Sequence, residues 1–259
     1  MSDISILDAI ILGLIQGFTE WLPISSSGHL VITQSLLGIT VPAAFDIVIM
    51  GGTIVALILY FRHTLLSLAR GICAGDRTTL RYCSFIVIAG IGTALVGLSG
   101  KQFFKGLFYQ PFLVSCLLIV TGIFLFIAST TKPAAGEMNA TRSFIIGIAQ
   151  GIAVAPGISR SGSTIGAALL LGIKAEDAAV FSFLIGIPAM TIASVVTFLE
   201  EPAGTVTFAP LAVATVTAFI SGYASIGLLM RLLKENRFII FAYYCIGAGL
   251  LFAVLTYHP

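Results

Sequence analysis

The chain has 259 residues, of which 58% are hydrophobic and only 9% are charged, and its formal net charge is +2. Soluble domains usually carry about 25% charged residues, so this composition, with a mean hydropathy of +1.09, excludes a water-soluble protein and indicates an integral membrane protein. The small net charge, without a basic stretch interleaved with aromatic residues, argues against nucleic-acid binding.

The first hydrophobic region, residues 4–39, is longer than the roughly 20 apolar residues that one helix needs to cross a bilayer. Pro23 and three serines interrupt it, so we interpret it as a helical hairpin that enters the membrane, turns inside it and leaves on the same side. Residues 143–173 form a second interrupted region of the same kind. Three apolar stretches of spanning length follow each hairpin, at residues 42–61, 82–98 and 112–128 and at residues 178–199, 208–230 and 238–256.

The two interruptions repeat one another. The segment from Gln16 to Gly28 aligns without a gap on the segment from Gln150 to Gly162, and Gly13 and Gly147 also match. Each hairpin precedes an odd number of spans, so the second half must be inverted relative to the first. We therefore expect an all-α integral membrane protein with an inverted-topology repeat, each half consisting of a re-entrant hairpin and three transmembrane helices, in which the two hairpin tips meet near the middle of the membrane. The whole chain, 1–259, is then one transmembrane domain with repeats at approximately 1–128 and 143–259.

The distribution of Lys and Arg predicts the orientation. Ten of the basic residues lie on one side and only Lys101 and Lys105 on the other, and the side rich in these residues is usually cytoplasmic. Both termini and the open end of the first hairpin are therefore expected to face outward from a multi-pass protein of the cytoplasmic membrane. The ten residues are Arg62, Arg70, Arg77, Arg81, Lys132, Arg142, Lys174, Arg231, Lys234 and Arg237.

The hairpin tips carry the polar chemistry. In the first, Gln16 and Glu20 are spaced to share one face of a helix, and Ser25, Ser26 and Ser27 precede a returning helix that we expect to begin near Gly28, with His29 on its first turn. The second tip carries Ser159, Arg160, Ser161 and Thr164. Hydroxyl groups, two helix N-termini, a guanidinium, an imidazole and a carboxylate can together hold a phosphate and attack it. A serine is the candidate nucleophile, with His29 or Glu20 as its base, and Glu20 could instead hold a divalent cation.

Simpler roles remain open for each of these residues. Glu20 and Arg160 could be only an ion pair that locks the hairpins together, although charges inside a membrane are usually functional. Any one of Ser25, Ser27, Ser159 and Ser161 is more readily a helix cap than a nucleophile. Ser26 aligns with Arg160 across the repeat, so we favour Ser26 as the nucleophile. His29 could be a packing residue.

These motifs resemble those of the undecaprenyl-diphosphate phosphatase family, which is associated with bacitracin resistance. The resemblance is carried by Gln16-x-x-x-Glu20, Pro23-Ile-Ser-Ser-Ser-Gly-His29 and Pro156-Gly-Ile-Ser-Arg-Ser-Gly-Ser-Thr164, and it extends to Phe181-Ser-Phe-Leu-Ile-Gly-Ile-Pro188. It implies hydrolysis of a polyprenyl diphosphate to the monophosphate carrier and inorganic phosphate, which recycles the carrier for peptidoglycan and other cell-wall glycans.

The resemblance also implies residue roles. Glu20, Ser26, His29 and Arg160 would be catalytic, Gln16, Ser159 and Thr164 would support them, and we add Ser25, Ser27 and Ser161 as substrate-binding candidates. A divalent cation, Mg²⁺ or Ca²⁺, is implied. Members of this family carry Glu or Gln at the position of Gln16, so this chain lacks one possible carboxylate there and Glu20 is the one candidate ligand. An active site open to the outer face is implied as well, in agreement with the predicted orientation. A homodimer is left open.

The main alternative function is a transporter or flippase of a lipid phosphate or small anion, because inverted repeats with broken helices are typical of carriers. A pure carrier, however, does not need Glu, Ser and His on one tip. A channel is disfavoured, because the sequence offers neither a ring of like charges nor a repeated carbonyl filter.

Overall fold

The computed structural model describes residues 4–131, 136–200 and 207–257, and the regular structure in these ranges is entirely α-helical. Within these ranges five helices are long and apolar enough to cross a membrane, and a sixth span results if α3 and α4, bent by 72° at Phe61, are counted as one. The helices are α1 (Ile6–Trp21), α2 (Ser26–Leu37), α3 (Ala43–Tyr60), α4 (Arg62–Cys73), α5 (Arg77–Ser99), α6 (Lys101–Leu107), α7 (Pro111–Ser129), α8 (Ala140–Ile152), α9 (Arg160–Leu170), α10 (Ala175–Glu200), α11 (Phe208–Lys234) and α12 (Ile239–Thr256).

The predicted spans agree with α3, α5, α7, α10, α11 and α12 to within a few residues. The sequence did not predict α4 or α6. Both are short and carry basic residues, so neither stood out from the loops as an apolar segment. These findings confirm a multi-pass, all-α membrane protein.

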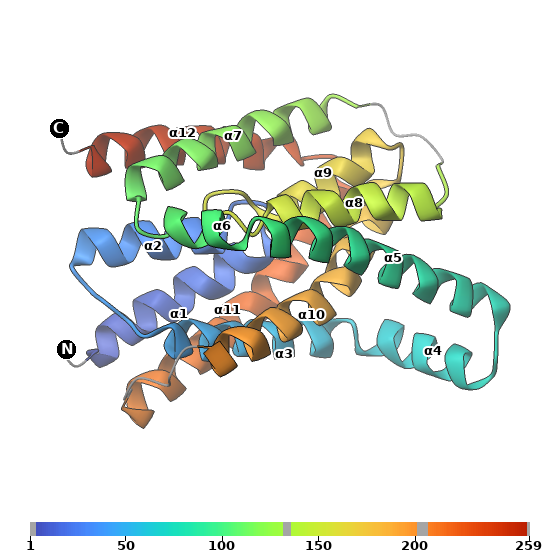
Figure 1. The fold of residues 1–259 in the computed structure, drawn as a ribbon, viewed down its shortest axis with the longest axis horizontal. Helices are drawn as coiled ribbons and strands as arrows, with labels where there is room; N and C mark the ends of the chain where they lie inside the picture. The colour runs from blue at the N-terminus through green and yellow to red at the C-terminus, as the bar shows by residue number, and fades with distance from the viewer. Residues whose placement is uncertain (1–3, 132–135, 201–206, 258–259) are drawn as a thin grey trace.

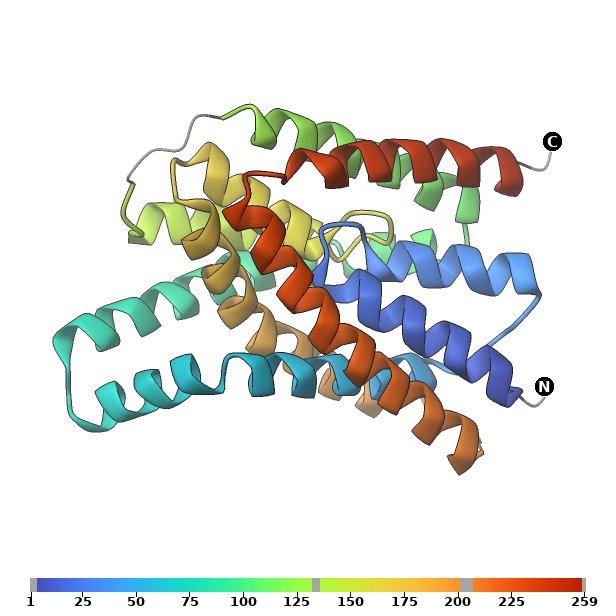
Figure 2. The same ribbon diagram turned by 180° about the vertical axis from the view of Figure 1, so that it is seen from behind.

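Each predicted hairpin is a pair of helices broken in the middle. The helix α1 ends at Trp21 before the extended residue Leu22, and α2 begins at Ser26, two residues earlier than expected. In the second hairpin α8 ends at Ile152 and α9 begins at Arg160. Figures 1 and 2 show both tips in the middle of the molecule, between the long helices.

Each hairpin packs against a helix from the opposite half of the chain. The helix α1 lies along α11, and α8 lies along α5, while α7 and α12 lie side by side (Figure 1). Glycine permits the close approach in both hairpins. A Cβ atom on Gly17 would lie 2.5 Å from the Ala218 carbonyl oxygen, and one on Gly151 would lie 2.8 Å from the Thr93 carbonyl oxygen.

Two of the residues that the sequence assigns to the basic side lie together at one end of the molecule. Figure 1 shows both termini at one end and the turn between α4 and α5 at the other. That turn is flanked by Arg70 in the last turn of α4 and Arg77 at the start of α5. On α6, Lys101 and Lys105 both pair with Glu200 at the end of α10. Of the ten residues assigned to the basic side, Lys132 lies outside the described residues.

Candidate functional site

Ser25 joins the two hairpin tips. Its side-chain oxygen caps α2 by accepting a hydrogen bond from the Gly28 N–H (3.3 Å), and it also accepts one from the Gly157 N–H of the other tip (3.1 Å). The backbone of Ser25 has φ 66° and ψ 91°, a conformation that costs a non-glycine residue about 1–3 kcal/mol. The expected meeting of the tips is therefore confirmed as a direct contact, made through a strained residue.

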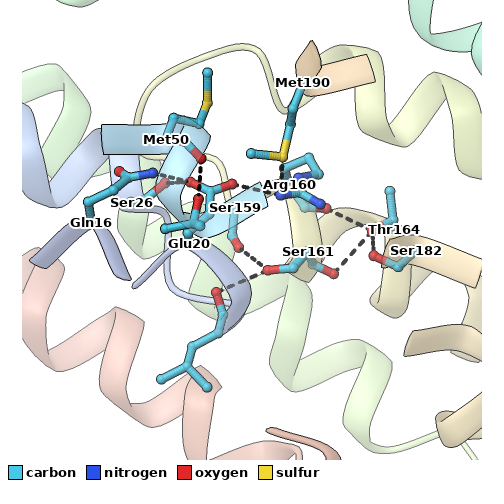
Figure 3. Close-up of polar contacts among 12 residues, drawn as sticks. Gln16, Glu20, Ser26, Met50, Ser159, Arg160, Ser161, Thr164, Ser182 and Met190 are labelled. Carbon is cyan, nitrogen blue, oxygen red and sulfur yellow. Dashed lines mark hydrogen bonds and ion pairs between the residues drawn. The ribbon is translucent and has the colours of Figure 1, made fainter. Parts of the chain in front are cut away.

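Four of the predicted residues form one cluster beside this junction (Figure 3). The Glu20 carboxylate accepts hydrogen bonds from Gln16 Nε2 (3.0 Å), Ser26 Oγ (2.5 Å) and Arg160 Nη2 (2.6 Å). The side chains of Glu20 and Arg160 are only 9% and 14% exposed. A buried ion pair of this kind is held by its further hydrogen bonds, because the desolvation of two charges offsets much of their attraction.

The Arg160 guanidinium is held by more than the carboxylate. It lies 4.8 Å from the centre of the Trp21 ring, and Nη2 also contacts Met190 Sδ at 2.9 Å. On the other side it lies against α10 at Gly186, where a Cβ atom would collide with Nη1. Nη1 is buried and has no hydrogen-bond partner among the described residues, so one strong donor of this cation is unused.

The hydroxyl groups of the second tip hold its backbone. Ser159 caps α9 by accepting from the Gly162 N–H (3.1 Å), as expected for a serine at this position. Ser161 donates to the Leu22 carbonyl at the end of the first hairpin's α1 (3.0 Å). Thr164 is fully buried, donates to the Arg160 carbonyl (2.9 Å) and shares a 2.5 Å hydrogen bond with Ser182. These contacts are structural, and they fix the position of Arg160 at the start of α9.

His29 and Ser27 lie on α2 but outside the cluster. Ser27 is half-buried on the first turn. The His29 ring is buried, with Nδ1 2.8 Å from the Ser25 carbonyl and Nε2 2.9 Å from the Tyr244 hydroxyl on α12. Both ring nitrogens are thus already engaged, and in the structure Glu20 is the basic group within reach of Ser26.

The cluster offers one carboxylate for a metal ion. The described residues contain no group of three or more His, Cys, Asp or Glu side chains that could hold a metal together. Glu20, the Ser26 hydroxyl and the Gln16 amide oxygen are hard oxygen donors of the type that Mg²⁺ and Ca²⁺ prefer. They fit a cation that shares its coordination with a phosphate group of a ligand, rather than one held by the protein alone.

Several contacts of the site were not predicted. Gly186, Met190 and Ser182 come from α10, Thr121 from α7 and Tyr244 from α12. Thr121 fixes the second tip by donating to the Gly157 carbonyl (2.8 Å) and accepting from the Ser159 N–H (3.2 Å). The segment from Phe181 to Pro188 stood out in the sequence only because it resembles a motif of the family. Gly186 in that segment was the one sequence signal that a large side chain, here Arg160, packs against it.

The fold and the site together define a multi-pass membrane protein with a buried serine, carboxylate and arginine at the junction of two broken hairpins. The chain belongs to the family of the bacitracin resistance protein BacA, whose family model matches residues 9–251. It is 42% identical to an undecaprenyl-diphosphatase of Syntrophotalea carbinolica, over 96% of this chain and 99% of that protein. Proteins of the same name from Desulfosudis oleivorans and Methanosphaera stadtmanae are 40% and 36% identical, over 94% and 98% of this chain and 96% and 99% of their own length.

Proposed function

We propose that this protein is an undecaprenyl-diphosphatase, which hydrolyses the lipid diphosphate to the monophosphate carrier and inorganic phosphate and so returns the carrier to cell-wall glycan synthesis. The observation that carries this proposal is the 2.5 Å hydrogen bond from Ser26 Oγ to Glu20, beside the Arg160 guanidinium. A hydroxyl with a base in contact and a cation next to it is the arrangement that phosphoryl transfer requires. The name shared by relatives over almost the whole length of the chain supports the same substrate.

In the proposed mechanism Ser26 attacks the terminal phosphorus of the diphosphate and transfers its proton to Glu20. A bond forms between Oγ and phosphorus, and the bond from phosphorus to the bridging oxygen breaks, releasing the polyprenyl monophosphate. Water then attacks the phosphoserine, the Oγ–phosphorus bond breaks as Glu20 returns its proton to Oγ, and inorganic phosphate leaves. Arg160 binds the equatorial phosphate oxygens throughout, with the N–H groups at the start of α2 and α9 nearby.

We further propose that a divalent cation, Mg²⁺ or Ca²⁺, takes part. Glu20 would hold it with the Ser26 hydroxyl and the Gln16 amide oxygen, and the phosphate oxygens of the substrate would complete its coordination. Bound there, the cation would supply positive charge against the charge of the diphosphate. In the structure the Glu20 carboxylate is in contact with three donors, Gln16, Ser26 and Arg160.

A carrier of lipid phosphate is the other function that broken hairpins suggest. It is not favoured, because a carrier needs the cation and the helix ends but not a serine hydroxyl in contact with a buried carboxylate. The flanking contacts also hold Arg160 on three sides, through Glu20, Met190 and the Trp21 ring, which suits a fixed catalytic group.

We infer that the chain is an inverted repeat that spans the cytoplasmic membrane with both termini and the site's opening outward. The repeats are residues 1–128 and 143–259. Two sets of contacts support the repeat. Gly13 and Gly17 of α1 approach Ala214, Ala218 and Gly222 of α11, and the aligned Gly147 and Gly151 of α8 approach Ala89, Thr93 and Gly97 of α5, with the same spacing of four residues in each. The charge difference between the two ends supports the orientation.

Cysteine labelling in intact cells tests this topology. Thr40, after the first hairpin, and Lys174, after the second, are both exposed. In the inferred arrangement a membrane-impermeant maleimide labels Thr40→Cys from outside, whereas it labels Lys174→Cys only after the cells are permeabilised. The unsubstituted chain measures the background from the native cysteines. Labelling of both positions from the same side would rule out the inverted repeat, and the reverse pattern would rule out the orientation.

Phosphate release by purified protein in detergent tests the function. With a long-chain polyprenyl diphosphate and Mg²⁺ or Ca²⁺, the wild type should release inorganic phosphate and form the monophosphate in equal amounts. Chelation with EDTA should abolish release, and added Mg²⁺ should restore it. Release that is insensitive to chelation would contradict the proposed cation. No release by folded protein with either metal would contradict the enzyme, and transport of a lipid phosphate in proteoliposomes would then be measured.

A further inference from the structure

Tyr244 on α12 contacts His29, a predicted site residue that lies outside the cluster around Glu20. Its hydroxyl lies 2.9 Å from His29 Nε2, and the two rings stack with centroids 5.7 Å apart and an interplanar angle of 15°. The Phe252 ring contacts His29 edge-on, also at 5.7 Å between centroids. One helix at the end of the chain therefore fixes both the plane and one nitrogen of the imidazole.

The hydrogen bonds determine which nitrogen of His29 carries the proton. The Ser25 carbonyl, 2.8 Å from Nδ1, can only accept, so Nδ1 must donate. In the neutral ring Nε2 is then an acceptor, and the Tyr244 hydroxyl donates to it. The lone pair that a general base would use is thus occupied by a residue on another helix.

His29 in turn contacts Ser25, the residue of the first tip whose backbone is strained. The Ser25 carbonyl accepts from His29 twice, from Nδ1 and from the backbone N–H (3.2 Å). The Ser25 side chain meanwhile holds the N–H groups of Gly28 and Gly157. A backbone at φ 66° persists only when its surroundings hold it there. Ser26 is the next residue in the chain, so the position of its Oγ beside the Glu20 carboxylate depends on the conformation of Ser25.

From these contacts we propose that Tyr244 is a positioning residue for the proposed reaction: through His29 it holds Ser25 in its strained conformation and so keeps the Ser26 hydroxyl aligned. His29 acts in the same way and is not the base. The inference rests on the proposed function, because its kinetic consequence is read from phosphate release. It assigns a role to a tyrosine that lies outside both hairpins.

The substitution Tyr244→Phe tests this role, because it removes the hydroxyl and keeps the stacked ring. Loss of a residue that orients a functional side chain typically costs about 10- to 100-fold in activity, and we expect kcat to fall by that factor. KM should stay within about twofold of wild type, because no contact to the substrate is lost. Tyr243→Phe is the matched control: Tyr243 is the next residue on α12, faces Phe126, and should tolerate the change without loss.

A spectroscopic readout separates positioning from a loss of fold. With ¹⁵N-labelled histidine, His29 should show a protonated Nδ1 and an Nε2 that accepts a hydrogen bond, and Tyr244→Phe should abolish the signature at Nε2 alone. Unchanged kcat in Tyr244→Phe would overturn the proposal, and so would a raised KM at constant kcat or a protonated Nε2 in the wild type. If the wild type released no phosphate, the proposed function would fail, while the nitrogen spectrum would still decide whether Tyr244 fixes His29.

Discussion

Arg160→Lys is expected to lower kcat for phosphate release by about 10²- to 10³-fold, the usual cost of removing one preorganised donor to a developing anion. Lysine keeps the charge, so the Glu20 carboxylate is not left buried without a partner. It loses the planar fork, however, and with it the second nitrogen, Nη1, which is buried and has no hydrogen-bond partner in the part of the chain that the structure describes. The measurement is steady-state kinetics of release at saturating lipid substrate, with a thermal melt of each variant.

Gly186→Ala examines the same guanidinium without changing it. The added Cβ atom collides with Nη1, so Arg160 must move off its present position and kcat should fall while the charge stays in the site. Gly90→Ala is the matched control, because a Cβ atom there meets nothing within 4 Å and the helix gains up to about 1 kcal/mol. Full activity in both Arg160→Lys and Gly186→Ala would show that the fork of Arg160 does not bind the phosphate.

Ser26→Ala is expected to reduce kcat by on the order of 10³-fold or more, because it removes the attacking oxygen itself. The side chain is only half-buried and its hydrogen bond goes to Glu20, so the melting temperature should change little. Single-turnover release and a search for phosphoserine by mass spectrometry complete the measurement.

The control for this variant is Ser225→Ala, a buried serine on α11 that donates to the Gly17 and Gly222 carbonyls and not to a side chain of the cluster. It should lose some stability and retain activity. If Ser26→Ala instead kept most of its release, water would be the nucleophile and Glu20 its base. If Ser26→Ala released no phosphate but still moved lipid phosphate across proteoliposomes, the protein would combine hydrolysis with transport.

The sequence predicts the spans and the broken hairpins because their signals are local. Apolar stretches such as 208–230 stand out by hydropathy, and Pro23 with its serines marks a break that Gly157 and its neighbours repeat. The ion pair between Glu20 and Arg160 was also foreseeable, since each is a charge in an apolar region and the repeat brings both to a tip. Ser25 and Ser159 proved to be caps for the reason that the sequence suggested.

The remaining contacts depend on how distant helices pack. Tyr244 is one of several aromatic residues in an apolar segment, and no spacing within that segment distinguishes it as the partner of His29. Met190 and Gly186 contact Arg160 only because α10 packs against the second tip along this part of its length. Helix α4 was missed because its five basic and polar positions mask its apolar stripe. The residues of the cluster were therefore predictable, whereas the residues that support it required the three-dimensional packing.

The pairing of each hairpin with a helix of the other half has a consequence for biogenesis. The helix α1 is synthesised before α11, yet the surface that accommodates Gly17 belongs to α11. Until then the polar tip with Glu20 lacks its permanent cover and must be shielded by water, by the insertion machinery or by another helix. The first hairpin can therefore reach its final packing only after α11 has been synthesised.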